Sequence, residues 1–379
     1  MIGTVEKSKK VTSSDAFKFN FKFWQILGVY PIRSCSILYA VFITLSGGLT
    51  ATMTIFLFSL DRLNDILLNL SVNATSAAIN LKSLNIFFRR QTILDANIWI
   101  RHLDSRASSA QEQACLLLAV RRARIVFYLT CAMFFSSIIL GEFAALLSNE
   151  GKLMCPAWYP FDWRYSILGY SIVHVHQMVV LMIYALENIS NDTFPAVYML
   201  VLTSHVKTLN IRIRKLGMDS AKSCKDNCQE LIQCIKDQQI LIEYFHMVRK
   251  ATSAAIFLQF FVTGIGVCVT AVCAFFANGN LFEIIYLAEY SLCIILEIFL
   301  YCYFGNELAD ESNRMSGAIY SCNWTNQDKS FRKNLLIFLQ STQTNMMIVA
   351  GGIFPVDLST FVSVMKSSYS LFAVLMQMT

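Results

Sequence analysis

The apolar stretch at the C-terminus carries a row of polar residues at helical spacing. The residues that recur at alternating steps of three and four are Ser363, Ser367, Ser370, Val374 and Gln377. This spacing places them on one face of a helix. A polar face is costly against lipid but not against a water-filled axis, so the row predicts a helix that lines an aqueous pore. Alternatively, the serine hydroxyls bond the backbone carbonyl four residues back, which is common in membrane helices.

The other reactive side chains do not indicate catalysis or metal binding. His174 and His176 are two residues apart, and within a helix this spacing turns the two rings away from each other. Cys224, Cys228 and Cys234 lack the spacing of a zinc site. The sequence contains no nucleophile–base pair, phosphate-binding loop, cofactor motif or cluster of histidines and carboxylates. It therefore predicts no enzyme, no catalytic residue, no metal and no cofactor.

Charged residues inside apolar stretches are functional candidates by default. Glu142, Glu289 and Glu297 are carboxylates of this kind. Glu289 and Glu297 lie eight residues apart on one helix face. Alternatively, these two carboxylates have a structural role and form hydrogen bonds to neighbouring helices. Lys366 flanks the serine row, and it faces either an aqueous vestibule or a carboxylate partner.

The composition indicates that membrane helices position these residues. Hydrophobic residues make up 55% of the 379 residues and charged residues only 15%, with a mean hydropathy of +0.51; a soluble chain carries roughly 25% charged residues. A membrane crossing needs ~20 apolar residues. Seven such spans are predicted, at 35–58, 66–88, 125–148, 166–187, 254–277, 281–304 and 355–378, the second being weaker and richer in Asn and Ser. A half-apolar helix is predicted near 335–350.

The basic residues predict the orientation of these spans. Lysine and arginine favour cytoplasmic loops, and one set of alternate segments holds 26 of the 31. The other set holds only Arg62, Lys152 and Arg164. The N-terminus is therefore expected inside the cell and the C-terminus outside. A G-protein-coupled receptor has the opposite orientation and usually a disulfide between outer cysteines, whereas here Cys155 is the only cysteine clearly outside.

These spans divide the chain into four parts. Residues 1–34 form a cytoplasmic N-terminus whose aromatic and lysine-bearing stretch 17–31 is expected to lie at the lipid surface. Residues 35–202 hold spans one to four. Residues 203–354 hold spans five and six together with charged helical extensions that form a cytoplasmic anchor, and residues 355–379 hold the last span.

Four stretches resemble one known family. They are LGVYP at 27–31, MCPAWYPFDWRYSILGYSIVHVHQ at 154–177, FGNELADESNRMSGAIYSCNW at 304–324 and FPVDLSTFVSVMKSSYSLFAVLMQMT at 354–379. In this order, and with this length and topology, the chain resembles insect odorant receptors, which are ligand-gated cation channels of olfactory neurons. Its loop between spans four and five is shorter than that of the shared co-receptor, so the chain looks like a tuning, odour-binding subunit.

The resemblance implies partners and a location. Members form tetramers in which the last span of each subunit lines one central pore, so a hetero-oligomer with the co-receptor, a small volatile odorant and membrane lipid are the expected partners, and nucleic acid is not. A multi-pass protein of the plasma membrane, in the dendrite of an olfactory sensory neuron, is implied. The ending VLMQ is similar to the family's VLxQ pattern, which assigns Val374 to the hydrophobic gate and Gln377 to a polar ring.

The resemblance also implies a ligand pocket in the outer half of the bundle, between spans two, three, four and six. The candidates there are Phe134, Ser137, Ile138, Gly141, Tyr165, Leu168, Ile172, His176 and Tyr286. Aromatic residues at helical spacing alternatively serve only to pack the bundle.

Two other functions compete with this one. A gustatory-type receptor channel would favour an ending of the type TYxxxxQF, from which SYSLFAVLMQ departs. A small-molecule transporter would show an inverted repeat and broken helices at mid-membrane, and the sequence shows neither.

Overall fold

The chain folds into a long bundle of helices. The computed structural model describes residues 12–30, 36–61, 63–146, 153–164, 166–276, 281–343 and 345–378. In chain order, the elements are η1 (Ser13–Phe17), α1 (Lys18–Ile26), α2 (Ser36–Leu57), α3 (Leu63–Arg106), α4 (Ala110–Leu146), α5 (Ile167–Arg214), α6 (Cys224–Phe276), α7 (Leu281–Tyr320), α8 (Lys329–Ser341), β1 (Val349–Ala350), β2 (Phe354–Pro355) and α9 (Leu358–Met378). The expected all-α membrane architecture is confirmed.

Within the described residues, six helices are long and apolar enough to cross a membrane, namely α2, α4, α5, α6, α7 and α9. Helix α3 covers the second predicted span and is long enough, with 44 residues, but it is more polar than these six. Its polar side chains bond neighbouring segments: the Asn69 side-chain amide donates to the Pro156 carbonyl at 2.7 Å, and the Ser46 hydroxyl donates to Asn80 at 2.7 Å. The polarity of α3 thus serves contacts within the bundle.

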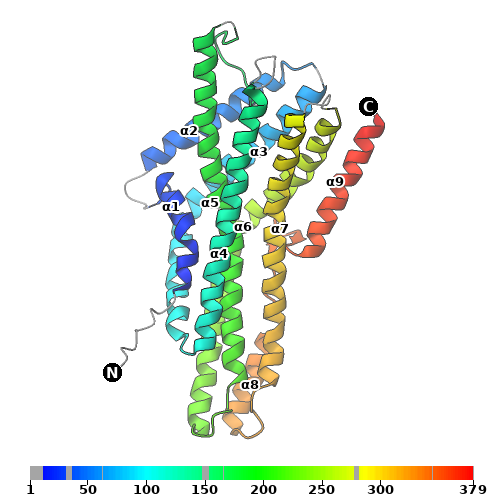
Figure 1. Ribbon diagram of the computed structural model, residues 1–379. Coiled ribbons are helices and arrows are strands. Elements are labelled where there is room, and N and C mark those ends of the chain that lie inside the picture. Colours follow the sequence, from blue (N-terminus) through cyan, green and yellow to red (C-terminus); the bar gives the residue numbers. More distant parts are fainter. Residues whose placement is uncertain are drawn as a thin grey trace, which may run out of the picture.

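Helices α3 to α7 run well beyond a membrane thickness. Helix α6 has 53 residues and is about 80 Å long at 1.5 Å per residue, whereas ~20 residues cross the bilayer. We call the end of the bundle formed by residues 89–124, 194–252 and 305–341 the anchor half. The other end, which carries α9 and the loop 153–164, is the cavity half (Figure 1).

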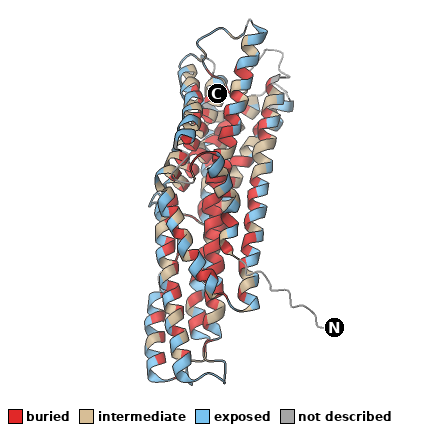
Figure 2. Cartoon of the chain, turned by 90° about the vertical axis from the view of Figure 1, so that its left-hand side faces the viewer, coloured by how far each residue is buried: buried red, intermediate tan, exposed pale blue. Residues whose placement is uncertain are grey.

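The largest part of the buried core extends from the middle of the bundle into the anchor half. Figure 2 shows buried residues concentrated in the middle of the bundle. The largest cluster of buried apolar side chains includes Leu209, Leu241, Phe304 and Phe331, from four different helices. A smaller cluster in the cavity half is centred on residues such as Val180. The anchor half is therefore the better packed part of the molecule.

The N-terminal helices pack against α5. The Trp24 indole donates to the Asn191 side-chain oxygen at 3.0 Å, and the Asn20 amide donates to the Ser190 carbonyl at 2.9 Å. Phe17 and Trp24 are buried, so one face of the expected lipid-surface segment contacts the bundle. Contact of its other face with lipid stays a prediction.

The segment before α9 is a hairpin rather than a continuous helix. The predicted helix near 335–350 is wrong beyond Ser341, where α8 ends. Strands β1 and β2 pair antiparallel, with Ala350 opposite Phe354. The turn between them uses Gly351 and Gly352 at φ of +60° and +76°, a backbone conformation that glycine adopts without strain.

Helix α9 stands apart from the other membrane helices (Figure 1). It begins where Asp357 accepts a hydrogen bond from the backbone N–H of Thr360 at 2.8 Å, as an N-cap residue does. It contacts α6 through Ser368, whose hydroxyl donates to the Gly264 carbonyl at 3.0 Å. Only 11% of the most apolar 18-residue stretch of α9 is buried, the lowest share among the six apolar helices of the described chain.

Candidate functional site

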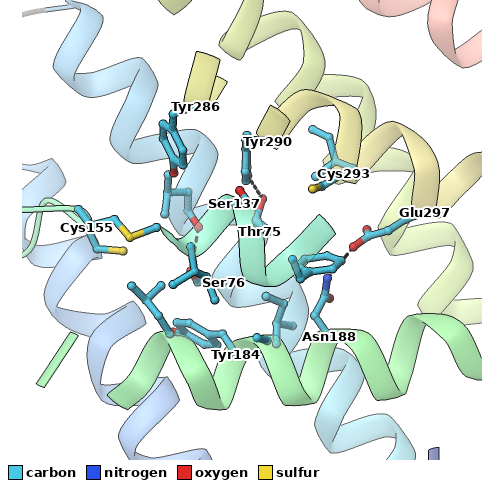
Figure 3. Close-up of a pocket in the computed structure, with 18 residues that line it drawn as sticks. Thr75, Ser76, Ser137, Cys155, Tyr184, Asn188, Tyr286, Tyr290, Cys293 and Glu297 are labelled. Atoms are coloured by element: carbon cyan, nitrogen blue, oxygen red, sulfur yellow. Dashed lines mark hydrogen bonds between the residues drawn. The ribbon is translucent and has the colours of Figure 1, made fainter. Parts of the chain in front are cut away.

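A cavity of about 90 Å³ lies in the cavity half, between α3, α4, α5 and α7 (Figure 3). Apolar side chains form much of its wall. They are Val72, Ile79, Phe134, Ile138, Met154, Leu181, Ala185 and Ile294. The polar side chains that reach it include hydroxyls from α3, α4, α5 and α7, the amide of Asn188 and the carboxyl of Glu297. A mostly apolar cavity with a few polar groups suits a small organic ligand.

The loop between α4 and α5 closes the outer end of the cavity. Met154 and Cys155 of this loop line it. The Gln177 side chain holds the loop in place, because its oxygen accepts from the Cys155 backbone N–H at 3.1 Å and its nitrogen donates to the Cys155 carbonyl at 2.7 Å. In addition, the Trp158 backbone N–H donates to the Thr52 carbonyl at 3.1 Å, tying the loop to α2.

Tyrosines on two helices have fixed hydroxyls at the cavity. The Tyr184 hydroxyl donates to the Ser46 carbonyl at 2.6 Å and lies 2.7 Å from the Thr50 hydroxyl. The Tyr290 hydroxyl lies 2.7 Å from the Thr75 hydroxyl. Figure 3 shows Tyr286 and Tyr290 entering from α7, opposite Tyr184 on α5. These bonds restrain the positions of the polar groups around a ligand.

A cluster of buried polar side chains forms the inner end of the cavity. The Asn188 amide donates to Glu297 Oε1 at 2.5 Å, and the Gln259 amide donates to Glu297 Oε2. Behind them, Lys82 Nζ lies 2.6 Å from Asp192 Oδ2 and donates to Asn188 and Gln259, both at 2.9 Å. We call Lys82, Asn188, Asp192, Gln259 and Glu297 the buried polar cluster. It joins α3, α5, α6 and α7.

Four of the nine residues predicted to bind ligand line this cavity. They are Phe134, Ser137 and Ile138 on α4 and Tyr286 on α7. Gly141 lies beside it, and a Cβ atom there would come within 2.6 Å of Met154 Cε and 2.9 Å of Tyr286 Cε2. The cavity also lies between the four spans from which it was expected. Contact of these residues with a ligand stays a prediction.

The other candidates lie elsewhere. Leu168 and Ile172 are 71% and 53% exposed on the surface of the single chain and do not line the cavity. His176 lies beside the closing loop, where its Nδ1 is 3.2 Å from the Tyr159 hydroxyl. Tyr165 is outside the described residues. His174, by contrast, bonds Glu142 Oε1 at 2.8 Å, so the two histidines have different partners.

Sequence reasoning missed most of the cavity's inner end. The sequence indicates Glu297 as a carboxylate inside an apolar stretch, but it does not by itself indicate Lys82, Asn188, Asp192 and Gln259 as one cluster. The available signal was the pair Asn188 and Asp192, which are four residues apart on one face of α5 and therefore both able to reach a lysine on a neighbouring helix.

The polar row on α9 faces away from the rest of the bundle for much of its length. Ser370, Val374 and Gln377 are exposed in the single chain. The Ser363 and Ser367 hydroxyls each donate to the carbonyl four residues back at 2.9 Å, as the alternative interpretation expects. These two serines also border a groove of about 450 Å³ between α6 and α9. Pore lining by the row stays a prediction.

Comparison with known proteins gives a consistent result. A family model described as 7tm Odorant receptor matches residues 62–369. Odorant receptor 59a of Drosophila melanogaster is 29% identical, over 97% of this chain and 98% of its own, and odorant receptor 2a of the same species is 27% identical over the same shares.

Two solved structures have a similar fold. The olfactory receptor OR5 from Machilis hrabei aligns with a TM-score of 0.82 at 17% identity, over 96% of this chain and 97% of that one. The same receptor in complex with eugenol aligns with a TM-score of 0.83 at 16% identity, over 97% of this chain and 100% of that one. At this identity the similarity establishes the fold.

Proposed function

The chain belongs to the insect odorant receptor family, and from this premise we propose that it is a subunit of an odorant-gated, non-selective cation channel. The observation that carries the proposal is the mostly apolar cavity between α3, α4, α5 and α7. A small volatile molecule binds there, with its carbon skeleton against Phe134 and Ile138 and its polar group toward the hydroxyls or Glu297. The eugenol complex of the Machilis receptor supports ligand binding by this fold.

Helix α9 lines the pore of the proposed channel. Its exposed row of polar residues needs a polar environment that lipid does not provide, and three further subunits around a central axis supply one. The partners are copies of the odorant receptor co-receptor in a heterotetramer. Val374 forms a hydrophobic constriction that excludes water when closed, and Gln377 forms a polar ring one turn nearer the C-terminus.

Ligand binding reaches α9 through α6. Gln259 on α6 bonds Glu297 at the inner end of the cavity. Just over one helical turn further along α6, Gly264 accepts the hydrogen bond from Ser368 of α9. A ligand that displaces Glu297 therefore moves the helix on which α9 rests, and a small rotation of α9 withdraws Val374 from the axis.

The proposed orientation has the N-terminus inside and the C-terminus outside, with the anchor half in the cytoplasm. The basic residues support this, because 26 of 31 lie in the segments assigned to the inside. The cavity half then lies toward the outer side of the plasma membrane of the neuron's dendrite, where odorants arrive.

Odorant-evoked current tests the proposal. Cells that express this chain with the co-receptor should give inward cation current on odorant application. Cells that express only one of the two subunits should give little or no current in response to the same odorants. Val374→Ser should raise the current without odorant, because a hydroxyl wets the constriction. Gln377→Glu should change the permeability ratio among cations.

Phe372→Ser is the matched control, since Phe372 is on α9 but outside the polar row. With surface expression measured in each case, it should leave basal current and permeability ratio unchanged. If Val374→Ser and Gln377→Glu behave like Phe372→Ser, α9 does not line the pore. If no odorant evokes current from the assembled pair, the chain is not an odorant-gated channel subunit.

A further inference from the structure

The inner end of the cavity presents hydrogen-bond acceptors. Glu297 reaches the cavity wall and receives one N–H from Asn188 and one from Gln259. A carboxylate has about four lone-pair positions, so the two amide donors leave further lone pairs on a side chain that lines the cavity. Figure 3 shows Glu297 and Asn188 side by side at this end.

Lys82 fixes the direction of both amides. Its ammonium group donates to the Asn188 side-chain oxygen and to the Gln259 side-chain oxygen, each at 2.9 Å. A lysine ammonium only donates, so both amide oxygens must point toward Lys82 and both NH₂ groups toward Glu297. Lys82 is thus a positioning residue: it does not line the cavity, but it determines that Glu297 is held as an acceptor.

The acidic side chains at this end outnumber the basic ones. Lys82 is bonded to both oxygens of Asp192, at 2.7 and 2.6 Å, and both side chains are only 3% exposed. Glu297 is a second buried carboxyl. Among the described residues joined by these hydrogen bonds, Lys82 is the one cation against two acidic side chains. The next acidic residue along α5, Glu187, is also buried and accepts from Ser83 at 3.3 Å.

From this geometry we propose that the receptor selects ligands whose polar group donates hydrogen bonds, namely alcohols and primary amines, with that group bound to Glu297. The inference rests on the proposed odorant-binding function and narrows the ligand class of the same cavity. An ether or ester of the same size has an oxygen that only accepts hydrogen bonds. At Glu297 this oxygen faces another acceptor and stays unpaired. An unpaired buried polar group is costly, which makes such a site selective.

The size of the cavity favours short ligands. An apolar cavity of ~150 Å³ holds benzene in an engineered protein, whereas this one measures about 90 Å³. A short alkyl chain packs against Ile79, Phe134 and Ile138. A longer chain requires movement of side chains such as Met154, which has three rotatable bonds and adapts readily.

The test compares isosteric ligands on the assembled channel. Hexanol, hexylamine and methyl pentyl ether, with shorter and longer homologues, are applied to cells that express the chain with the co-receptor, and the half-maximal concentration is measured for each. The alcohol or the amine should act at concentrations at least about tenfold lower than the ether, since hydrogen bonds to charged groups are the strong ones. If the amine is more potent than the alcohol, part of the preference is due to its charge. If the amine and the alcohol are equally potent, the preference is due to hydrogen bonding alone.

Glu297→Gln should reduce this preference to near unity, because the new amide nitrogen can donate to an ether oxygen. Glu289→Gln is the matched control: Glu289 is on the same helix, accepts from the Ser136 hydroxyl and does not line the cavity, so the preference should persist. Equal potency of alcohol, amine and ether on the wild-type receptor overturns the inference, without any variant. So does a surface-expressed Glu297→Gln receptor that keeps the wild-type preference.

The inference and the proposed function fail in different ways. A receptor that responds to odorants with equal potency for alcohol, amine and ether contradicts only the inference about the ligand class. A receptor that gives no odorant-evoked current with any ligand contradicts the proposed function and the inference together.

Discussion

Replacing Lys82 by methionine removes the cation that compensates a buried carboxylate. Asp192 is 3% exposed and its carboxylate lies 2.6 Å from Lys82 Nζ. Methionine keeps most of the side-chain volume but leaves Asp192 without a counter-charge, and the oxygens of Asn188 and Gln259 lose their donor. Removal of one partner of a buried ion pair costs about 3–5 kcal/mol. A typical domain has a free energy of unfolding of about 5–15 kcal/mol, so we expect a strongly destabilised receptor.

The assay is unfolding of the purified chain in mixed micelles with increasing denaturing detergent, followed by tryptophan fluorescence. Lys82→Met, Asp192→Asn and the double variant form a cycle, and the double variant should be less destabilised than the sum of the single variants. Lys222→Met is the control, because the Lys222–Glu230 pair has the same 2.6 Å separation but its side chains are 42% and 32% exposed. Exposed pairs of this kind contribute at most about 1 kcal/mol.

Two results would refute the reasoning. Lys82→Met that unfolds at the wild-type detergent concentration would mean that Asp192 does not depend on this cation. Equal destabilisation by Lys82→Met and Lys222→Met would mean that burial of the pair has no energetic role.

Three further predictions concern topology, the cavity and an acidic residue of the anchor half. An epitope added after Thr379 should be stained on intact cells, and staining that requires permeabilisation would contradict the proposed orientation. Tyr286→Ala should change the ranking of odorants by roughly 10- to 200-fold in relative potency, whereas Ile172→Ala, at a 53% exposed position outside the cavity, should not; odour ranking measured for both variants at equal surface level decides. Burial raises the pKa of Asp104 to about 6, so the folded state binds the proton more tightly than the unfolded state and the ionised carboxyl is destabilising above that pH. Asp104→Asn should therefore be more stable than wild type at neutral pH in the same unfolding assay, by a margin that shrinks as the pH falls through about 6, and a margin that does not vary with pH would contradict this assignment.

Hydropathy was sufficient to locate the membrane helices, because lipid imposes a minimum length of apolar sequence. The first predicted span, 35–58, is close to α2 at Ser36–Leu57. The second predicted span, 66–88, lies within α3 at Leu63–Arg106, although its Asn and Ser residues make it less apolar than the other spans. The hairpin after α8 was not predicted, because residues 335–350 are half-apolar in the way that a surface helix is. The turn depends on the positive φ of Gly351 and Gly352, and a pattern of apolar residues does not indicate backbone angles.

The choice of cavity residues depended on helix rotation, which hydropathy does not determine. Ser137 and Tyr286 face the cavity, whereas Leu168, assigned on the same grounds, is exposed. A membrane helix is apolar on its lipid face and on its packing face alike, so the pattern does not separate the two. The spacing of Asn188 and Asp192 indicates that both can reach one neighbouring helix, but it does not identify Lys82 as their partner, because that depends on how α3 lies against α5 and α6.

The distribution of the buried core has a consequence for substitutions that change ligand preference. The largest cluster of buried apolar side chains, which includes Leu209 and Leu241, lies in the anchor half and the middle of the bundle. The cavity half carries a smaller cluster, and its helices are exposed over much of their surface. Cavity-lining residues such as Val72 and Ser137 lie outside this largest cluster. We therefore expect substitutions there to change the contacts of a ligand at a small cost in the free energy of unfolding.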